Sequence, residues 1–513
     1  MEKKVRVRFA PSPTGGLHLG GVRTVLFNYL FAKQHNGEFI LRIEDTDQTR
    51  YVPGAEEYIY ETLSWCGLQP DESPLLGGQH APYRQSERKE LGIYRKYADE
   101  LVAKGLAYYA FDTPEELEAM RAQFKTEENP SPKYDGSLRL KMRNSLSLSE
   151  DEVQSLLVNN TPHVIRIKMP DNREVKFTDM IRGEVAFNTS LSDDKVLLKA
   201  DGMPTYHLAV VVDDYLMKIT HAFRGEEWLP SAPVHILLWE YLFGIENMPE
   251  WAHLPLILKP DGNGKLSKRD AERLGFPIFA MNWTDPRTQE HTQGFRERGF
   301  LPEAFVNMLA NLGWNDGTEQ EIFYIKELIE KFSIDRVHKG GAKFNYEKAL
   351  WFNHEWIKKL PVSNYKTILI KLFEEKGISI KDKEQFVKVI ELVKDRCTLL
   401  PDFVTQASFF FQRPENIDVT PVKSKWDEHK ATFFSELVRT YELTAFWQHD
   451  ELEKAFKEIA AASSLKPGEL MLPFRIMLVG GKFGPGVFDI AVLLGKEETI
   501  ERIKNGLRLL SEQ

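Results

Sequence analysis

Two glycine-bearing stretches of the sequence carry the residue types that bind phosphate. The first is RFAPSPTGGLHLG at residues 8–20, where two prolines hold the backbone extended and the glycines let it approach a ligand closely. A helical pattern follows from Gly21, and helix N-termini attract phosphate through their N–H groups and dipole. His18 stands just before this helix and could donate to a phosphoryl oxygen. The alternative is a structural loop with a structural histidine.

The second stretch is KPDGNGKLSKRDAER at residues 259–273. Its Lys265, Lys268 and Arg269 form a flexible cluster of cations that suits the charge on a transferring phosphate. A basic loop alone is usually solvated surface. Because each stretch follows a predicted strand, we expect the two to face the same nucleotide.

Hydrophobic periodicity predicts the elements that position these residues. Val5, Val7 and Phe9 alternate as in a strand, a helix follows from Gly21, and FILRIED at 39–45 is a second strand. Strand, helix and strand in close succession form a βαβ unit, which predicts a parallel sheet with helices on its faces.

A second unit of this kind is predicted further along the chain. HLAVVVDD at 207–214 is almost continuously apolar, as expected for a strand buried on both faces. Another strand is predicted at 219–225, then a helix over 226–243 and a strand at 252–258. The sequence thus predicts a nucleotide-binding domain in two halves.

The fold class that follows is α/β: a Rossmann-type parallel-sheet domain, split by an α+β insertion and followed by all-helical domains. The insertion contains capping boxes at Thr113 and Ser149 and a hairpin around Asp201-Gly202. Beyond residue 270 amphipathic helices dominate, such as 347–360 and 384–400. The predicted domains are 1–83 with 206–270 for the two halves, 84–205 for the insertion, 271–345 for a first helical domain and 346–513 for a second.

Composition excludes several classes of protein. The 513 residues have a net charge of −9, so any nucleic acid would be bound by focused contacts rather than by bulk basicity. The two cysteines, Cys66 and Cys397, cannot form a disulfide framework, and we expect them to be packing residues in a reducing compartment. No apolar run is long enough to span a membrane, and MEKKVRVRFA lacks the apolar core of a secretory signal. We therefore expect a cytoplasmic protein without membrane contact.

The motifs carry a family resemblance. HLGG at 18–21 and KLSKR at 265–269 resemble the two signature motifs of class I aminoacyl-tRNA synthetases. The surrounding text is similar to the bacterial glutamyl-tRNA synthetases of that class over nearly the whole chain: LRIEDTD (41–47), PYRQSER (82–88), PTYHLAVVVDD (204–214), FRGEEWL (223–229) and LPFRIMLVGGKFGPGVFDIAVLLGKE (472–497). The resemblance implies that the two halves are catalytic, that 84–205 binds the tRNA acceptor end, that 271–345 contacts the stem, and that 346–513 binds the anticodon, possibly in two subdomains.

The chain departs from the family pattern at several positions. Gly21 replaces the last histidine of the first motif, and Leu266 and Arg269 stand where the class has Met and Ser. Since no cysteine lies between Cys66 and Cys397, we expect none of the zinc sites that some members carry in the insertion. The segment 271–291 is longer than the family leads us to expect, and the sequence assigns it no role.

The resemblance also implies roles for individual residues. Glu44 would bind the α-ammonium of glutamate, and Arg8 and Arg224 its side-chain carboxylate, because guanidinium groups pair with carboxylates in bidentate geometry. The alternative for Arg8 is a purely structural ion pair with an acid such as Asp45. The implied catalytic residues are His18, Lys265 and Lys268, the ATP-binding residues are Gly20, Gly21, Leu266, Ser267, Lys268 and Arg269, and the glutamate-binding residues are Arg8, Ala10, Ser12, Glu44, Tyr206 and Arg224.

The implied reaction joins L-glutamate to tRNA(Glu) in two steps, through a glutamyl-adenylate and without a protein nucleophile. ATP would bring Mg²⁺, while the EDTD run at 44–47 lacks the further ligands of a calcium loop. The family leads us to expect that activation requires bound tRNA and that the chain is a monomer. Whether tRNA(Gln) is also charged stays open.

In the predicted anticodon domain, Arg396 is either a reader of bases or an exposed helical arginine. Trp351, Phe352 and Trp356 could stack on unpaired bases, although their helical spacing favours a core role.

Four other functions are less consistent with the sequence. A glutaminyl enzyme shares the chemistry, but its first motif differs before the histidine. A truncated paralogue that modifies a tRNA base lacks the anticodon domain. A catalytically inactive RNA-binding scaffold would not need intact His18, Lys265 and Lys268. A small-molecule nucleotidyltransferase would not need the long helical half.

Overall fold

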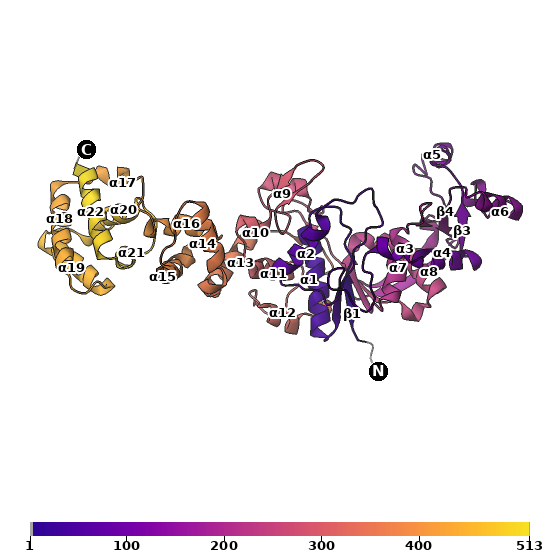
Figure 1. Ribbon diagram of the computed structural model, residues 1–513, viewed down its shortest axis with the longest axis horizontal. Coiled ribbons are helices and arrows are strands. Elements are labelled where there is room, and N and C mark those ends of the chain that lie inside the picture. The colour runs from indigo at the N-terminus through magenta and orange to yellow at the C-terminus, as the bar shows by residue number, and fades with distance from the viewer. Residues whose placement is uncertain (1–3, 512–513) are drawn as a thin grey trace. The chain divides into compact units, whose positions relative to one another are not determined.

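The computed structural model of the protein describes residues 4–511, so the ends of the predicted domains at 1–3 and 512–513 lie outside the described residues. The chain divides into two compact units. The first runs to Glu297 and adds Pro302–Tyr346, and the second joins Arg298–Leu301 to the chain from Glu347 onward. Figure 1 traces both units, each of which is described by itself below.

The first half of the nucleotide-binding domain has the predicted strand, helix and strand: β1 (Arg6–Phe9), α1 (Leu19–Gln34) and β2 (Glu38–Leu41). β1 and β2 pair in parallel, with Arg6 opposite Glu38. The helix begins earlier than predicted because His18 is its N-cap, and the His18 side chain accepts a hydrogen bond from the Gly20 amide.

The second half contradicts one prediction. Residues 207–214 are not a strand but lie within α7 (Tyr206–Leu216), which precedes β8 (His221–Gly225), α8 (Ala232–Leu242) and β9 (Glu250–Leu254). Its residues 208–214 are all buried, and a helix surrounded by protein is as apolar as a buried strand, so periodicity does not separate the two. Tyr206 therefore stands at the start of a helix.

The two halves meet between β1 and β8. The Thr220 amide donates to the Arg6 carbonyl at 2.9 Å, and the Arg6 amide donates to Thr220 Oγ1 at 2.8 Å. β8 pairs in parallel with β9. The carboxyl ends of β1 and β8 thus lie at one edge of the domain, where parallel α/β folds bind their ligands.

The insertion adds two strands to this sheet. β5 (Glu174–Asp179) and β6 (Gly183–Asn188) form a hairpin, and Asp179 of β5 pairs with Trp251 of β9, giving the order β6-β5-β9-β8. The remaining strands of the insertion, β3 (Ala107–Ala110), β4 (Val164–Ile167) and β7 (Val196–Leu198), form an antiparallel sheet of their own. Thus part of the insertion packs within the sheet that contains β8 and β9.

Local predictions in the insertion are confirmed. Both capping boxes are present, at Thr113 and Ser149. The turn at Asp201-Gly202 places Leu198 opposite Pro204, and Gly202 supplies the positive φ of 77° that the turn requires. The helices of the insertion are α3 (Gln85–Glu90), α4 (Ile93–Ala103), α5 (Pro114–Gln123) and α6 (Glu150–Val158).

The stretch 271–345, predicted to be helical, also holds short strands. β11 and β12 pair with each other, and β13 pairs in parallel with β10. The remaining elements of the first unit are α2 (Ala55–Trp65), β10 (Ile257–Leu258), α9 (Lys268–Leu274), β11 (Trp283–Thr284), β12 (His291–Thr292), α10 (Phe295–Arg298, whose last residue belongs to the second unit), α11 (Pro302–Asn311), α12 (Ile325–Lys331) and β13 (Ala342–Lys343).

The second unit is helical from α13 onward. The predicted helix over 384–400 ends at Val393, and a 3₁₀ turn (Lys394–Arg396) follows it. Phe352 and Trp356 are buried, as their spacing predicts, whereas Trp351 is only partly buried. The helices are α13 (Tyr346–Lys359), α14 (Lys366–Glu375), α15 (Lys383–Val393), α16 (Asp402–Ala407), α17 (Thr420–Lys423), α18 (Glu428–Leu443), α19 (His449–Ala462), α20 (Pro467–Val479), α21 (Val487–Leu494) and α22 (Lys496–Ser511).

The remaining sequence predictions concern thiols and membranes. Cys66 and Cys397 are both free and buried, which confirms their packing role, and burial raises the pKa of each thiol. Within residues 4–511 no helix is long and apolar enough to cross a membrane.

Asp213 near the end of α7 anchors the insertion to the nucleotide-binding domain. Its carboxylate is fully buried and accepts from Arg88 Nε at 2.6 Å, Gln85 Nε2 at 2.9 Å and the Tyr94 hydroxyl at 2.9 Å. Arg88 is itself 3% exposed, so it depends on this carboxylate for its charge balance.

We therefore predict that Asp213→Ala lowers the free energy of unfolding of the first unit by about 3–5 kcal/mol, because it leaves a buried arginine unpaired. Urea denaturation followed by tryptophan fluorescence measures the change. Glu240→Ala, which breaks the exposed ion pair with Arg173, is the control and should cost less than about 1 kcal/mol. Equal losses in the two variants would contradict the anchoring role.

Candidate active site

A cavity of about 700 Å³ lies at the carboxyl ends of β1 and β8. It brings together residues from both halves of the domain and from the loop before α9. Arg269 and Arg396 do not line it. The predicted site residues that do are Arg8, Ala10, Ser12, His18, Gly20, Gly21, Glu44, Tyr206, Arg224, Lys265, Leu266, Ser267 and Lys268.

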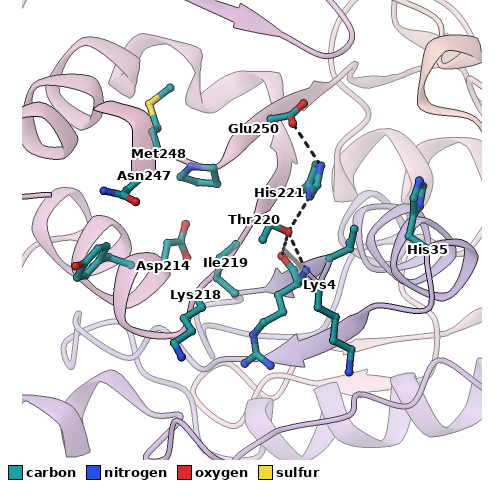
Figure 2. A pocket seen from close by; sticks show the side chains of 14 residues that line it. Lys4, His35, Asp214, Lys218, Ile219, Thr220, His221, Asn247, Met248 and Glu250 are labelled. Carbon is teal, nitrogen blue, oxygen red and sulfur yellow. Dashed lines mark hydrogen bonds and ion pairs between the residues drawn. The ribbon is translucent and has the colours of Figure 1, made fainter. Parts of the chain in front are cut away.

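Another cavity, of about 860 Å³, lies at the opposite, amino ends of the same strands. Figure 2 shows its lining, in which His221 lies between Thr220 and Glu250. None of the predicted site residues lines it. Because ligands of parallel α/β domains bind at the carboxyl ends of the strands, the cavity of 700 Å³ is the candidate active site.

His18 enters this cavity as a neutral hydrogen-bond donor. The Gly20 amide donates to His18 Nδ1 at 3.1 Å, so the proton of a neutral imidazole must sit on Nε2. Burial, together with the nearby Lys265 ammonium, lowers the pKa of His18 to about 4. At neutral pH, Nε2 therefore carries a proton, which an anionic ligand can accept in exchange for the contact of His18 with the Leu266 backbone.

The amides at the start of α1 are already occupied. Leu19 N–H donates to the Ile278 carbonyl at 2.9 Å, and Gly20 N–H donates to His18 Nδ1. Gly21 and Val22 both donate to the His18 carbonyl, at 2.7 and 3.1 Å. The amides at the start of this helix are therefore not free in this structure, and the role of Gly20 and Gly21 in binding phosphate stays a prediction. A Cβ at Gly21 would lie 2.7 Å from Leu17 Cδ1, so a larger residue fits there only if Leu17 shifts.

Four residues of the second motif, Lys265 to Lys268, line the cavity, and two of them also have structural roles. Leu266 is 2% exposed, and the Ser267 hydroxyl caps α9 in a capping box with Asp270. The two lysines are held by acids: Lys265 Nζ lies 2.7 Å from Glu227, and Lys268 Nζ lies 2.8 Å from Glu290. These pairs are solvent-exposed, so a polyphosphate can replace the carboxylates at little cost.

The unassigned segment 271–291 packs on the first motif. A Cβ on Gly16 would lie 2.9 Å from Trp283 Cγ, so the indole seats directly on the glycine backbone. The Tyr58 hydroxyl donates to the Met281 carbonyl at 2.6 Å and accepts from its amide at 2.9 Å. Together with the bond from Leu19 to Ile278, these contacts brace the loop that carries His18. No pattern in a single sequence links such distant residues.

Arg8 both lines the cavity and forms a buried ion pair. It is 4% exposed and lines the cavity, yet its Nε is bonded to Asp214 at 3.1 and 3.2 Å rather than to Asp45. Arg42 donates to Asp214 at 2.8 Å and to Glu44 at 2.9 Å. Although burial opposes it, the two arginines lower the pKa of Asp214. Sequence reasoning missed Arg42 and Asp214, because both were hidden within predicted strands.

Glu44 is buried at the edge of the cavity. Its carboxylate is 6% exposed and pairs with Arg42. Burial raises the pKa of Glu44, while Arg42 and Arg8 oppose the shift. An ammonium group arriving in the cavity would therefore stabilise the charged form of this carboxylate.

Arg224 is held without a carboxylate. Nε donates to His253 Nε2 at 2.9 Å, while Nη1 donates to the Tyr206 hydroxyl and to His235 Nδ1, each at 3.1 Å. Its Nη2 is buried and has no partner within the described chain. The guanidinium carbon lies 4.8 Å from the centre of the Trp251 ring. Because Arg224 lines the cavity and forms no ion pair within the described chain, its guanidinium fits a carboxylate ligand.

The acidic residues of the EDTD run have hydrogen-bond and ion-pair partners of their own. In the EDTD run, Glu44 pairs with Arg42, Asp45 accepts from Ser86, and Asp47 accepts from Thr49. Across residues 4–511 no three His, Cys, Asp or Glu side chains gather where they could hold a metal ion.

Arg396 lies in the second unit. It is exposed in the turn after α15 and stands near Arg475, whose pKa is lowered by burial and by the Arg396 charge. Arg475 Nη1 donates to the Gly484 carbonyl at 2.9 Å. Two neighbouring cations thus occupy this part of the unit.

The sequence model described as the catalytic domain of class I tRNA synthetases (E and Q) matches residues 4–351, and that of an anticodon binding domain matches residues 352–507. These matches, with the two-motif cavity, define the class as class I aminoacyl-tRNA synthetases. A curated relative named glutamate–tRNA ligase, from Flavobacterium johnsoniae, is 50% identical to this chain and covers 99% of this chain and 100% of that protein. Another relative of the same name, from Bacteroides fragilis, is 48% identical over 99% of both proteins. The chain belongs to the glutamate–tRNA ligase family.

Solved structures agree with this assignment. The crystal structure of a glutamate tRNA ligase from Elizabethkingia meningosepticum, in complex with its amino acid, has a TM-score of 0.94 at 48% identity and covers 99% of this chain and 100% of that one. The glutamate–tRNA synthetase from Elizabethkingia anophelis has a TM-score of 0.90 at 48% identity, with the same coverage.

We predict that the free energy of unfolding of the first unit falls as the pH drops from 6.5 toward 4. The unfolded chain protonates His18 near the ordinary pKa of 6.5 but the folded protein only near 4, so in this range the unfolded state binds more protons. His18→Gln should flatten this part of the pH dependence in urea denaturation. The exposed His291 offers a control, His291→Gln, that should not. An unchanged slope in His18→Gln would contradict a buried neutral imidazole.

Proposed function

We propose that the cavity of about 700 Å³ is where this chain forms glutamyl-adenylate from L-glutamate and ATP, and then transfers the glutamyl group to the 3′-terminal ribose of tRNA(Glu). The observation that carries the proposal is the pairing of two kinds of cation in one cavity. The cations Lys265 and Lys268, with the neutral donor His18, line the cavity for phosphate, and Arg224 lines it for a carboxylate. The names of the relatives support the same substrate.

In the first step, an oxygen of the glutamate α-carboxylate attacks the α-phosphorus of ATP. A P–O bond forms, the bond to the β-phosphate breaks, and pyrophosphate leaves with its electron pair. His18 Nε2–H donates to a phosphoryl oxygen, and the lysines exchange Glu227 and Glu290 for the phosphates. Mg²⁺ arrives with ATP as part of the substrate. Leu266, Ser267 and Arg269 then act by shaping the loop rather than by touching phosphate.

Glutamate is oriented by groups from both halves. Arg224 binds the side-chain carboxylate, Tyr206 adds its hydroxyl, and Glu44 binds the α-ammonium. Arg8 contributes through its position at the wall, since Asp214 already takes much of its charge. Ala10 and Ser12 line the same wall. This arrangement places the α-carboxylate toward the phosphates.

The second step attaches the glutamyl group to tRNA. The terminal ribose hydroxyl attacks the activated carbonyl, and AMP leaves. In the second unit, Arg396 is the residue we assign to the anticodon, with Arg475 as its neighbour. Under this proposal activation waits for tRNA, and the chain acts as a monomer in the cytoplasm.

The test is glutamate-dependent exchange of pyrophosphate into ATP, with and without total tRNA and with glutamine in parallel. We expect exchange with glutamate only when tRNA is present. Exchange with glutamine would favour the glutaminyl alternative. The absence of exchange under all conditions would overturn the proposed function, and exchange without tRNA would overturn only the requirement for tRNA.

Two variants should separate the two sides of the cavity. Lys268→Ala should slow adenylate formation by about 10²-fold or more, because it removes charge stabilisation of the leaving pyrophosphate. Arg224→Leu should raise the KM for glutamate far more than the KM for ATP. Pre-steady-state adenylate formation and steady-state exchange measure these effects. Equal effects of Arg224→Leu on both substrates would make Arg224 a structural arginine.

A further inference from the structure

Within the described chain, every hydrogen bond of the Arg224 guanidinium runs to a neutral acceptor atom. Arginine can only donate, so each atom that Arg224 meets must present a lone pair. The atoms that it meets are His253 Nε2, His235 Nδ1 and the Tyr206 oxygen. Both histidines must therefore be neutral and in one particular tautomer.

Asp179 fixes the first tautomer. Its Oδ2 lies 2.6 Å from His253 Nδ1, so Nδ1 carries the proton and Nε2 is left free to accept from Arg224. Asp179 is held in turn by the amides of Ile181 and Arg182 on Oδ1, each at 3.0 Å, and of His253 on Oδ2 at 3.1 Å. Asp179 and His253 are almost fully buried. The β5–β6 hairpin of the insertion thus supplies the carboxylate that orients Arg224, which lies in the second half of the nucleotide-binding domain.

The tautomer of His235 is set by its bonds to Arg224 and His207. Because His235 Nδ1 accepts from Arg224, its Nε2 carries the proton and donates to His207 Nδ1 at 3.1 Å. Burial, with the Arg224 charge as the next cause, lowers the pKa of His235 well below its ordinary value. Two chains of hydrogen bonds therefore end on one guanidinium.

The electrostatic result differs from that at Arg8. Arg8 meets a carboxylate at hydrogen-bond distance, whereas within residues 4–511 no carboxylate forms an ion pair with Arg224. In the chain of hydrogen bonds that runs through His253, the acid is Asp179, and the whole imidazole of His253 separates it from Arg224. Within the described chain, Arg224 is thus held in place by neutral acceptors while no carboxylate at ion-pair distance neutralises its charge, and its Nη2 is buried without a partner.

The geometry points to Asp179, His253 and His235 as positioning residues that present Arg224 to the side-chain carboxylate and thereby set the preference for glutamate over glutamine. This inference rests on the proposed function, because it assumes that the carboxylate of glutamate is the partner of Arg224. A carboxylate in place of either histidine would hold the arginine as firmly but would neutralise it, and a neutral amide substrate would then bind about as well.

The test replaces His253 in two ways in the full-length chain. His253→Leu removes the acceptor for Arg224 Nε. His253→Gln keeps the relay, because the Gln carbonyl can accept from Arg224 while its amide donates to Asp179. With tRNA present, His253→Leu should raise the KM for glutamate about tenfold or more, as expected for a lost hydrogen bond to a charged group, with kcat and the KM for ATP little changed. His253→Gln should restore most of the loss.

The matched control is another histidine on the strand of Arg224. His221 on β8 contacts Thr220 and Glu250 at the other end of the strand. His221→Gln should leave all constants unchanged. Thermal melting of each variant shows whether it is folded, and Asp179→Asn, nearly isosteric, is a second probe that should raise the KM for glutamate in the same direction.

The outcomes are distinguishable. If the wild-type chain does not activate glutamate at all, the proposed function fails first. If the wild-type chain is active but folded His253→Leu and His253→Gln have the same KM for glutamate, the positioning role is overturned. It is also overturned if His253→Leu lowers kcat and both KM values shift together, as general damage to the fold would do. A fall in the ratio of kcat/KM for glutamate to that for glutamine in His253→Leu, reversed in His253→Gln, supports the role in specificity.

Discussion

A buried cluster of two cations and two anions connects the halves of the catalytic domain. Arg8 from β1 and Arg42 from the chain after β2 share Asp214 of α7, and Arg42 also holds Glu44. Burying four charges is tolerable only while all of them are paired, so the loss of any member would leave another uncompensated. Since Tyr206 lies on the same helix as Asp214, this balance fixes one wall of the cavity against the other.

Much of the site was predictable because its chemistry is local in sequence. The loop around His18 and the loop around Lys268 each carry their glycines, prolines and cations within a few residues, and the capping box of Ser267 follows from the same spacing. Their partners were not predictable. Asp214 and Arg42 are charged residues inside apolar runs, and residues 207–214 are composed equally well for a buried helix or a buried strand.

The contacts that fix histidine tautomers, and those that occupy backbone amides, were not predictable from the sequence either. The amides of α1 are occupied because Ile278 and the His18 side chain reach them, and neither contact is encoded in the loop itself. Fold class follows from patterns of apolar residues, whereas the donor and acceptor balance of a site depends on residues brought together by the fold. A motif therefore indicates which residues gather, but the surrounding structure decides which of their atoms stay available.

The two sides of the cavity handle their cations in opposite ways, and the difference suits what each must bind. Lys265 is exposed and Lys268 is half-buried, and both pair with exposed carboxylates that solvent screens, so the two lysines can follow phosphates through a reaction in which charge moves. Arg224 is rigid, buried and surrounded by neutral acceptors, so its charge is directed at one fixed point. Under the proposed function, one carboxylate of the ligand stays in place while its other end reacts. Such a ligand requires both the buried arginine and the solvent-screened lysines in the same cavity.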